Sequence, residues 1–290
     1  MQAALAWLMA SRWRAVIVVF ALTVLPLTGI LAAAVLALIV LRHGLSEALL
    51  AAAVAGAGLL ALQLVSGGEP ASVLLIVGYW LVVMLLAAGL RRTGSQGRML
   101  ALAGLLGCAA VIGVFAATGD PAPQIERLMN EQVVPFYEQY GLEIAPEAIP
   151  PMAALMTGLA LGLWLMGCFV TVLLGRWAQA ILYNPGGFRR EFHALRLGHI
   201  TALASGVVFL SGLLLGQPLL GNMALVLVLM WAVQGLAVMH GVAGRANLHW
   251  VWLVPPYALA LVLPPHLIAL MAVMGFADRW VDIRARIGKA

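Results

Sequence analysis

The stretch ASVLLIVGYWLVVMLLAAGL, residues 71–90, runs for twenty residues without a charged side chain. An apolar helix of about 20 residues is long enough to cross the hydrocarbon core of a bilayer. Comparable runs recur along the 290-residue chain, at 45–65, 98–118, 151–175, 199–217 and 221–243. Only 9% of the residues are charged, whereas soluble domains have about a quarter. The sequence therefore predicts an all-α, polytopic helical membrane protein, a single transmembrane domain over 1–290 with about six full spans.

The loops between these runs differ in charge. The loop 119–150 carries six acids and one arginine, whereas the loops 91–98 and 176–196 are rich in arginine. Because basic loops stay in the cytoplasm, we expect 119–150 to be extracytoplasmic and both termini to be cytoplasmic, in a cell inner membrane. Apolar residues at helical spacing predict an amphipathic helix within 119–150, with a solvated connector as the alternative: Ile125, Leu128, Met129, Val133, Phe136 and Tyr140.

The apolar run 15–41 is too long for one crossing and too short for two. Arginines at both of its ends, Arg14 and Arg42, are expected on the same side of the membrane. Pro26 and Gly29 lie near its middle, so we predict a broken hairpin of two short helices.

The run 249–276 poses the same problem near the C-terminus. It contains Pro255–Pro256 and Pro264–Pro265, and two proline pairs cannot lie inside one unbroken helix. We predict a second broken hairpin, with a kinked single span and an external C-terminus as the alternative. Such interrupted segments point to a binding cavity, because irregular backbone at membrane depth must be buried in protein or line a cavity.

Few polar side chains lie inside the apolar runs. Gln234 is in the middle of one run, His240 is near the end of the same run, and His266 follows the second proline pair. Because polar groups at membrane depth usually face the bundle interior, we expect these three to line a ligand cavity. The alternative is that they form hydrogen bonds between helices or lie at the membrane boundary.

Residues 183–199, YNPGGFRREFHALRLGH, are unusually polar for this chain. They predict a cytoplasmic amphipathic helix over 184–198, in which Phe188, Phe192 and Leu195 form an apolar stripe. Arg189, His193 and Arg196 form a basic stripe, with Arg190 beside it. We expect these four residues to contact anionic lipid headgroups, a cytoplasmic partner protein or a phosphate-bearing ligand; simple membrane anchoring is the alternative.

Several kinds of chemistry are excluded or not indicated. Lys289 is the only lysine, so the chain has no Walker-type phosphate loop and no lysine inside a span for a Schiff base. No HExxH motif and no acidic pair within a span is present, and Cys108 and Cys168 have no second ligand at metal spacing. We therefore expect no enzymatic activity, no cofactor, no metal and no nucleic-acid partner. The glycine pairs in GLALG (158–162) and GLLLG (212–216) indicate close helix packing.

Several short motifs resemble the YybS-like family of bacterial multi-pass membrane proteins of unknown function. They are NPGGFRREFHALRLGH (184–199), QGLAVMHG (234–241), LRHGL (41–45) and a tail with Asp278, Asp282 and Arg284. That family is in turn similar to the substrate-binding S components of energy-coupling-factor transporters, which dock a coupling subunit through AxxxA motifs. Ala33 and Ala37 match that spacing, as do Ala6 and Ala10. The large acidic loop 119–150 is a feature that a simple vitamin-binding S component would not have.

Two functions follow as expectations. The first is a membrane protein that binds a small molecule or lipid, with a link to transport implied by the resemblance. The second is a non-catalytic scaffold that recruits a cytoplasmic partner through the basic helix 188–197.

Overall fold

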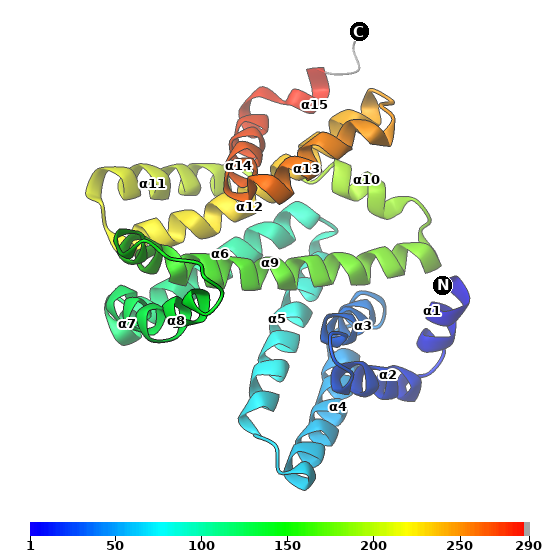
Figure 1. Ribbon diagram of the computed structural model, residues 1–290. Helices are drawn as coiled ribbons and strands as arrows, with labels where there is room; N and C mark the ends of the chain where they lie inside the picture. The colour runs from blue at the N-terminus through cyan, green and yellow to red at the C-terminus, as the bar shows by residue number, and fades with distance from the viewer. Residues whose placement is uncertain (287–290) are drawn as a thin grey trace. The chain divides into compact units, whose positions relative to one another are not determined.

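The structure is a computed structural model in which residues 1–286 are described; Lys289 lies outside the described residues. Every regular element in residues 1–286 is a helix (Figure 1). The chain divides into two compact units. Unit 1 comprises residues 1–99 and 167–195, and unit 2 comprises 100–166 and 196–290. Two helices, α6 (Gln96–Thr118) and α9 (Ile149–Tyr183), contribute to both units.

Five helical segments in residues 1–286 are long and apolar enough to cross a membrane. They are α4 (Leu45–Ser66), α5 (Ala71–Thr93), α6, α9 with the preceding 3-10 turn η2 (Pro146–Ala148), and α12 (Pro218–Arg245). Each coincides with a predicted span. The sixth predicted span, 199–217, forms α11 (His199–Leu215), whose 17 residues place it among the shorter apolar helices.

The N-terminal apolar run is broken where Pro26 and Gly29 predicted. It forms α2 (Arg12–Val24) and α3 (Gly29–Arg42), separated by residues 25–28. A further helix, α1 (Gln2–Met9), precedes α2 and is bent from it by 115°. The hairpin of α4 and α5 completes this part of unit 1 (Figure 1).

The glycine of LRHGL has a local role at the end of α3. Gly44 has a φ of 112°, which side chains other than glycine rarely adopt. A Cβ there would lie 2.8 Å from Nη1 of Arg91. Arg91 uses this space to donate a hydrogen bond of 2.8 Å to the Val40 carbonyl, which also accepts one of 3.1 Å from the Gly44 N–H, so two donors meet at the last helical turn.

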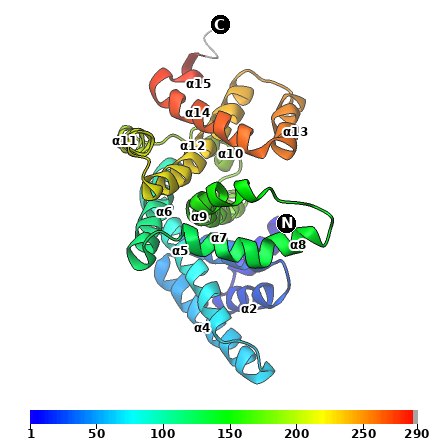
Figure 2. The ribbon, with the colours of Figure 1, turned by 60° about the vertical axis from the view of Figure 1, so that its left-hand side comes forward.

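The C-terminal run is also broken, and both proline pairs lie in first turns. The 3-10 turn η3 (Trp250–Leu253) leads into α13 (Val254–Val262), and α14 (Pro264–Val281) follows after a break at Leu263 (Figure 2). In a first turn the backbone N–H has no helical partner, so proline is tolerated there. Arg245 at the end of α12 donates to the carbonyl of Arg284 in α15 (Ile283–Arg286). The segment between Arg245 and Arg284 therefore begins and ends at the same place, as the hairpin prediction requires.

Unit 2 is built around α12, which packs along α14 at backbone contact. A Cβ on Gly235 would lie 1.9 Å from the Met271 carbonyl oxygen, and one on Gly275 would lie 2.2 Å from the Trp231 carbonyl oxygen. The Trp231 ring stacks edge-on against Phe276, at a centroid distance of 5.0 Å. Only glycine permits so close an approach of two helices.

A second close contact joins α12 to α9. Asn222 accepts a hydrogen bond of 2.6 Å from the Gly158 N–H and donates one of 2.8 Å to the Ala154 carbonyl. These two backbone groups pair with each other in a regular α-helix. Gly158 and Gly162, the first predicted glycine pair, both lie against α12. Of the second pair, Gly216 instead ends α11 with a φ of 60°.

The loop 119–150 contains the predicted helix, but the apolar stripe is divided. It forms α7 (Ala122–Leu128), the π-helical turn η1 (Met129–Val133) and α8 (Val134–Glu138), one continuous rod in Figure 2. Met129 is buried against Ile149 and Ala153 of α9. Phe136 and Tyr140, predicted on the same face, are exposed.

Candidate functional site

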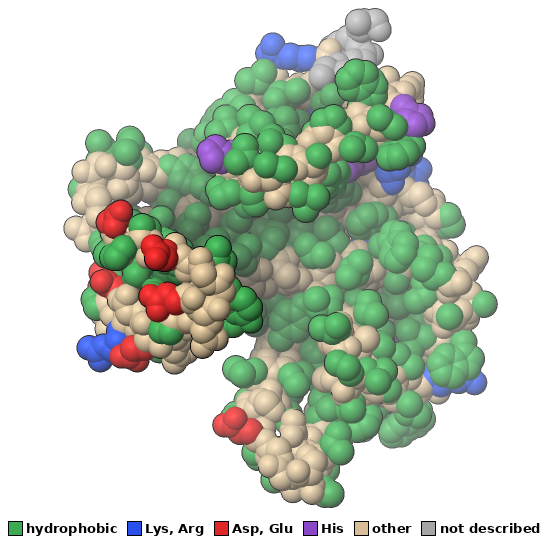
Figure 3. Space-filling model, in the orientation of Figure 1, with side chains coloured by type: hydrophobic (Ala, Val, Ile, Leu, Met, Phe, Trp, Pro, Cys, Tyr) green, Lys and Arg blue, Asp and Glu red, His purple; other side chains and the backbone are tan. Residues whose placement is uncertain are grey.

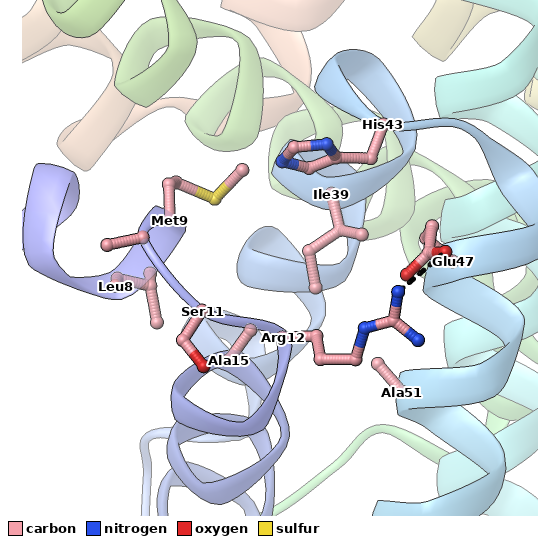
Figure 4. A pocket seen from close by; sticks show the side chains of 10 residues that line it. Leu8, Met9, Ser11, Arg12, Ala15, Ile39, His43, Glu47 and Ala51 are labelled. Atoms are coloured by element: carbon pink, nitrogen blue, oxygen red, sulfur yellow. Dashed lines mark ion pairs between the residues drawn. The ribbon is translucent and has the colours of Figure 1, made fainter.

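A pocket with mixed polar and apolar walls lies at the corner between α1 and α2 in unit 1 (Figure 4). Its volume is about 410 Å³, within the range of about 300–1,000 Å³ that is typical of small-molecule sites. The apolar walls include Leu8, Ala15 and Ile39, and the polar groups come from Ser11, Arg12, His43 and Glu47. The residues at the start of α2 and the end of α3 meet here because residues 25–28 turn the chain back.

Arg12 and Glu47 point toward each other across one side of the pocket, and His43 lies on another side (Figure 4). The Arg12 Nη2 to Glu47 Oε1 distance is 3.6 Å, and the side chains are 61% and 38% exposed. A loose, exposed ion pair of this kind contributes about 1 kcal/mol or less. Breaking this pair therefore costs little free energy, and Arg12 and Glu47 can each bind an oppositely charged group of a ligand instead.

The corner itself is held by Arg14 and Trp7. The Arg14 guanidinium lies 4.9 Å from the centre of the Trp7 ring, and its Nη1 donates to the Trp7 carbonyl at 3.3 Å. Ser11 between the two helices is extended, with a φ of −152°. The arginine thus binds both the ring and the last turn of α1, and fixes α1 against the start of α2.

An apolar hollow of about 380 Å³ lies on the other side of α1. Its lining side chains come from α1, α2, α3 and α9, and include Leu5, Val18, Leu38 and Trp177. Leu8 lines both this hollow and the polar pocket. Unit 1 therefore places a site for charged groups next to a site for hydrocarbon, and the two share the side chain of Leu8.

The sequence patterns did not predict this site. We interpreted Arg14 and Arg42, the neighbours of Arg12 and His43 in the chain, as topology signals only, and Glu47 has no place in any motif of the sequence. The bend at Ala10 and Ser11 has no proline or glycine to mark it, and the pocket exists only because of that bend. The one available signal was the pairing of two basic clusters, at 12–14 and 42–43, on one predicted side.

Gln234, predicted to line a cavity, is fully buried and hydrogen-bonded to backbone. Its Oε1 accepts from the Leu197 N–H at 2.6 Å, and its Nε2 donates to the Gly275 carbonyl at 2.7 Å. It thereby joins α12 to α14 and to the segment before α11. This arrangement corresponds to the alternative we named, a hydrogen bond between helices.

His240 and His266 do not join Gln234 in a common site. His240 Nδ1 lies 2.9 Å from the Leu236 carbonyl, so Nε2, 3.1 Å from the Tyr257 hydroxyl, is assigned as an acceptor. His266 is exposed in the first turn of α14. The pockets at the α1–α2 corner are lined by other residues.

The predicted basic helix is shorter than expected. It forms α10 (Gly187–His193), not a helix over 184–198 or 188–197. The Leu197 N–H donates to Gln234 instead of to a helical carbonyl, and the chain before α11 is non-helical. Arg189 and Arg190 are exposed and His193 is half-buried, but Arg196 lies outside α10 and does not continue their stripe.

Of the three predicted apolar positions, Phe188 and Phe192 lie on α10, and Leu195, beyond its end, is buried. Phe188 and Phe192 stack with a centroid distance of 6.2 Å and line an apolar hollow of about 380 Å³ with Trp177 and other side chains of α9. Glu191 accepts hydrogen bonds from the Arg176 guanidinium, one of them 2.8 Å long, which fixes α10 to α9.

Arg196 belongs to a cluster of charges at the end of α14. It binds Asp282 through both guanidinium nitrogens and lies 3.6 Å from Asp278. Asp278 is fully buried and pairs at 2.8 Å with Arg284, which is 2% exposed. The hydrogen bond from Arg196 holds the pKa of the Asp282 carboxyl below its usual range, and burial lowers the pKa of Arg284.

Other potentially reactive groups are dispersed. In residues 1–286, no group of three or more His, Cys, Asp or Glu side chains is placed to hold a metal ion. Cys108 and Cys168 are free and buried. Ala33 and Ala37, at the spacing of a docking motif, are fully buried within the chain, and a Cβ on Gly175 would lie 2.9 Å from that of Ala37.

No family model matches the chain, and neither does any curated protein or solved structure. The resemblance to the YybS-like family therefore rests on the short motifs alone.

Proposed function

We propose that this protein is a multi-pass inner-membrane protein that binds a membrane amphiphile at the α1–α2 corner, with both termini in the cytoplasm. The observation that supports the proposal most directly is the placement of the two sites. Leu8 lines both the polar pocket and the apolar hollow, so the two are adjacent and together suit one molecule with a charged head and a hydrocarbon tail.

The charges of the pocket favour a zwitterionic headgroup. Arg12 and His43 suit a phosphate, because a guanidinium forms two parallel hydrogen bonds with it. Glu47 disfavours a purely anionic head and suits an ammonium group. A phosphoethanolamine headgroup carries both charges at adjacent positions, so it can replace the loose Arg12–Glu47 pair with two pairs of its own.

The test is native mass spectrometry of the full chain in an uncharged detergent with added phosphatidylethanolamine, phosphatidylglycerol or phosphatidylcholine. We expect phosphatidylethanolamine to bind most tightly. Arg12→Ala should weaken binding of all three lipids by about tenfold, the value of one charge-assisted hydrogen bond. Glu47→Gln should instead remove the preference for phosphatidylethanolamine over phosphatidylglycerol.

Two substitutions serve as controls for charge. Arg127→Ala and Glu69→Gln change exposed residues that do not line the pocket, and both should leave lipid binding unchanged. A wild-type protein that binds the three lipids equally, with no effect of Arg12→Ala, would contradict the proposal.

A scaffold that recruits a cytoplasmic partner through α10 is the second candidate. The exposed Arg189 and Arg190 and the hollow beside Phe188 and Phe192 support it. Affinity purification of the full chain in mild detergent, followed by mass spectrometry of bound proteins and lipids, distinguishes the two functions. A scaffold would bring down a protein that is lost from the Arg189→Ala, Arg190→Ala double variant, whereas this variant should keep its corner-bound lipid.

A further inference from the structure

The aromatic face of the loop 119–150 is exposed, although its residues are of the kind that proteins bury. It consists of Val133, Phe136, Tyr137 and Tyr140. Phe136 is 55% exposed and Tyr140 is 70% exposed. The Phe136 ring centre lies 6.0 Å from that of Tyr137 and 5.2 Å from that of Tyr140. The three rings therefore form one continuous surface that residues 1–286 leave uncovered.

The exposure of this face follows from the π-helical turn that precedes it. Pro135 has no N–H to donate to the carbonyl four residues earlier, and the turn Met129–Val133 absorbs the change. In a regular helix, Met129 and Phe136 would share a face. A π turn has more residues per turn, so the chain after it is rotated. Met129 stays in the core with Ile149 while the rings turn outward.

The surroundings of the aromatic face are strongly acidic. Figure 3 shows acidic side chains gathered over α7 and α8. The loop has six acids, Asp120, Glu126, Glu131, Glu138, Glu143 and Glu147, against Arg127 alone. None of the six forms an ion pair within residues 1–286. Five of them are exposed, and Glu126 is half-buried.

We propose that the aromatic face is a docking surface for an arginine- or lysine-rich segment of a partner protein. Cationic side chains bind the faces of tyrosine and phenylalanine, and pairs of arginine with aromatic residues dominate many interfaces. The unpaired acids supply the complementary potential that attracts and orients such a segment. Prolines at 121, 123 and 135 restrict the backbone, so the surface is ordered before the partner binds.

A membrane surface is a poorer occupant for this face. Helices that lie in the interface carry lysine and arginine on their polar side, because the headgroups they meet are anionic. Here the polar side carries carboxylates, which anionic headgroups repel. This surface and the lipid site at the α1–α2 corner depend on different residues, so either can fail without the other.

The test uses the full chain in an uncharged detergent and a fluorescent helical peptide with leucines on one face and arginines on the other. The control peptide has glutamate in place of each arginine. Fluorescence anisotropy should show binding of the arginine peptide only. Raising the salt from about 0.1 M to about 1 M shortens the Debye length from about 10 Å to about 3 Å and should weaken the binding strongly.

Substitutions separate the contribution of the aromatic rings from that of the acidic side chains. Phe136→Ala and Tyr140→Ala should each weaken binding by about two- to fivefold, as expected for exposed cation–π contacts. The double variant Glu131→Lys, Glu138→Lys should abolish it, while Glu69→Gln, an exposed acid outside the loop, should have no effect. Circular dichroism of each variant reports whether the helices are retained.

Two results would overturn the proposal. One is equal binding of the arginine and glutamate peptides. The other combines two observations. The arginine peptide does not bind, and brominated lipids in nanodiscs quench tyrosine fluorescence in the wild-type protein but not in the double variant Tyr137→Phe, Tyr140→Phe. That result would assign the aromatic face to the membrane surface.

Discussion

At the scale of single residues, two glycines set how closely α12 and α14 approach each other. Gly235 and Gly275 lie opposite each other, and a Cβ on Gly275 would be 2.6 Å from the Gly235 nitrogen. Their backbone contact brings the Gly275 carbonyl within reach of Gln234. The packing and the buried hydrogen bond of unit 2 therefore depend on the same two positions.

Gly235→Ala should destabilise the protein. Its methyl group would overlap backbone atoms of Met271, which cannot rotate away as a side chain can. Overpacking of this kind costs about 1–3 kcal/mol. Thermal unfolding in detergent should show a lower midpoint. Gly206→Ala in α11, where nothing lies within 4 Å of the new methyl group, should leave the midpoint unchanged or slightly higher. Equal midpoints for the two variants would contradict this explanation.

A cluster of charges holds the short helix α15 in place. Arg284 is buried beside Asp278, and Arg196 reaches Asp282 from the segment before α11. Asp278 Oδ1 is buried with no hydrogen-bond partner among the described residues. Removing one member of such a buried set leaves an uncompensated charge, so the attachment of α15 should respond sharply to changes in charge.

The attachment of α15 should weaken in acid. The pKa of Asp282 is lowered by Arg196, so the ionised pair stabilises the folded state above the ordinary carboxyl pKa of about 3.9. That stability is lost as the pH falls below about 4 through the lowered pKa. A pH-insensitive dye on Arg286→Cys should keep a constant anisotropy down to about pH 4 and become mobile below it.

The control for this prediction is Arg196→Gln. Without the arginine, the Asp282 pKa should return toward its ordinary value, so the pH dependence that comes from this pair should be lost and the dye should already be more mobile near neutral pH. Superimposable pH profiles for the two proteins would show that Arg196 does not control the attachment.

The breaks between elements differ in how well the sequence predicted them. The breaks at residues 25–28 and at Leu263 were predicted, because proline removes a helical hydrogen bond wherever it stands. The bend at Ala10 and Ser11 and the early end of α10 were not. The early end of α10 depends on a contact with a distant group, Gln234 on Leu197, which leaves no local pattern, and the bend is marked by neither proline nor glycine.

The arrangement of arginines along the whole molecule predicts its orientation. The two ends of the segment 246–283 meet at Arg245 and Arg284, and the start of α2 meets the end of α3 at the α1–α2 corner. Both terminal segments therefore return to the side from which they start. The positive-inside rule then predicts that these meeting points are cytoplasmic and that 119–150 is on the opposite side.

Cysteine labelling tests this orientation. A membrane-impermeant maleimide should label Glu138→Cys in intact cells, and Ala246→Cys and Arg286→Cys only after the cells are made permeable. All three positions are exposed, whereas Cys108 and Cys168 are buried and should give little background. Labelling of Arg286→Cys from outside would favour the kinked single span that we named as the alternative.

Across the whole chain, long apolar runs predicted the main helices well, because a membrane-length helix needs little beyond length and hydrophobicity. The candidate site was not predicted, since its residues come from α1, α2, α3 and α4 and meet through the folded chain. Gln234, the residue we expected in a cavity, is occupied by backbone groups of Leu197 and Gly275 that any sequence contains.

The contact between Asn222 and α9 has a consequence for the order of assembly. When α9 emerges from the ribosome, α12 has not been made, and the Gly158 N–H has only the Ala154 carbonyl as a helical partner. Asn222, 64 residues further on, then supplies both an acceptor and a donor to these groups. The hydrogen bonding of α9 is therefore completed after its own synthesis. In a nascent chain that stops before residue 222, the Gly158 N–H and the Ala154 carbonyl should bond to each other and not to Asn222.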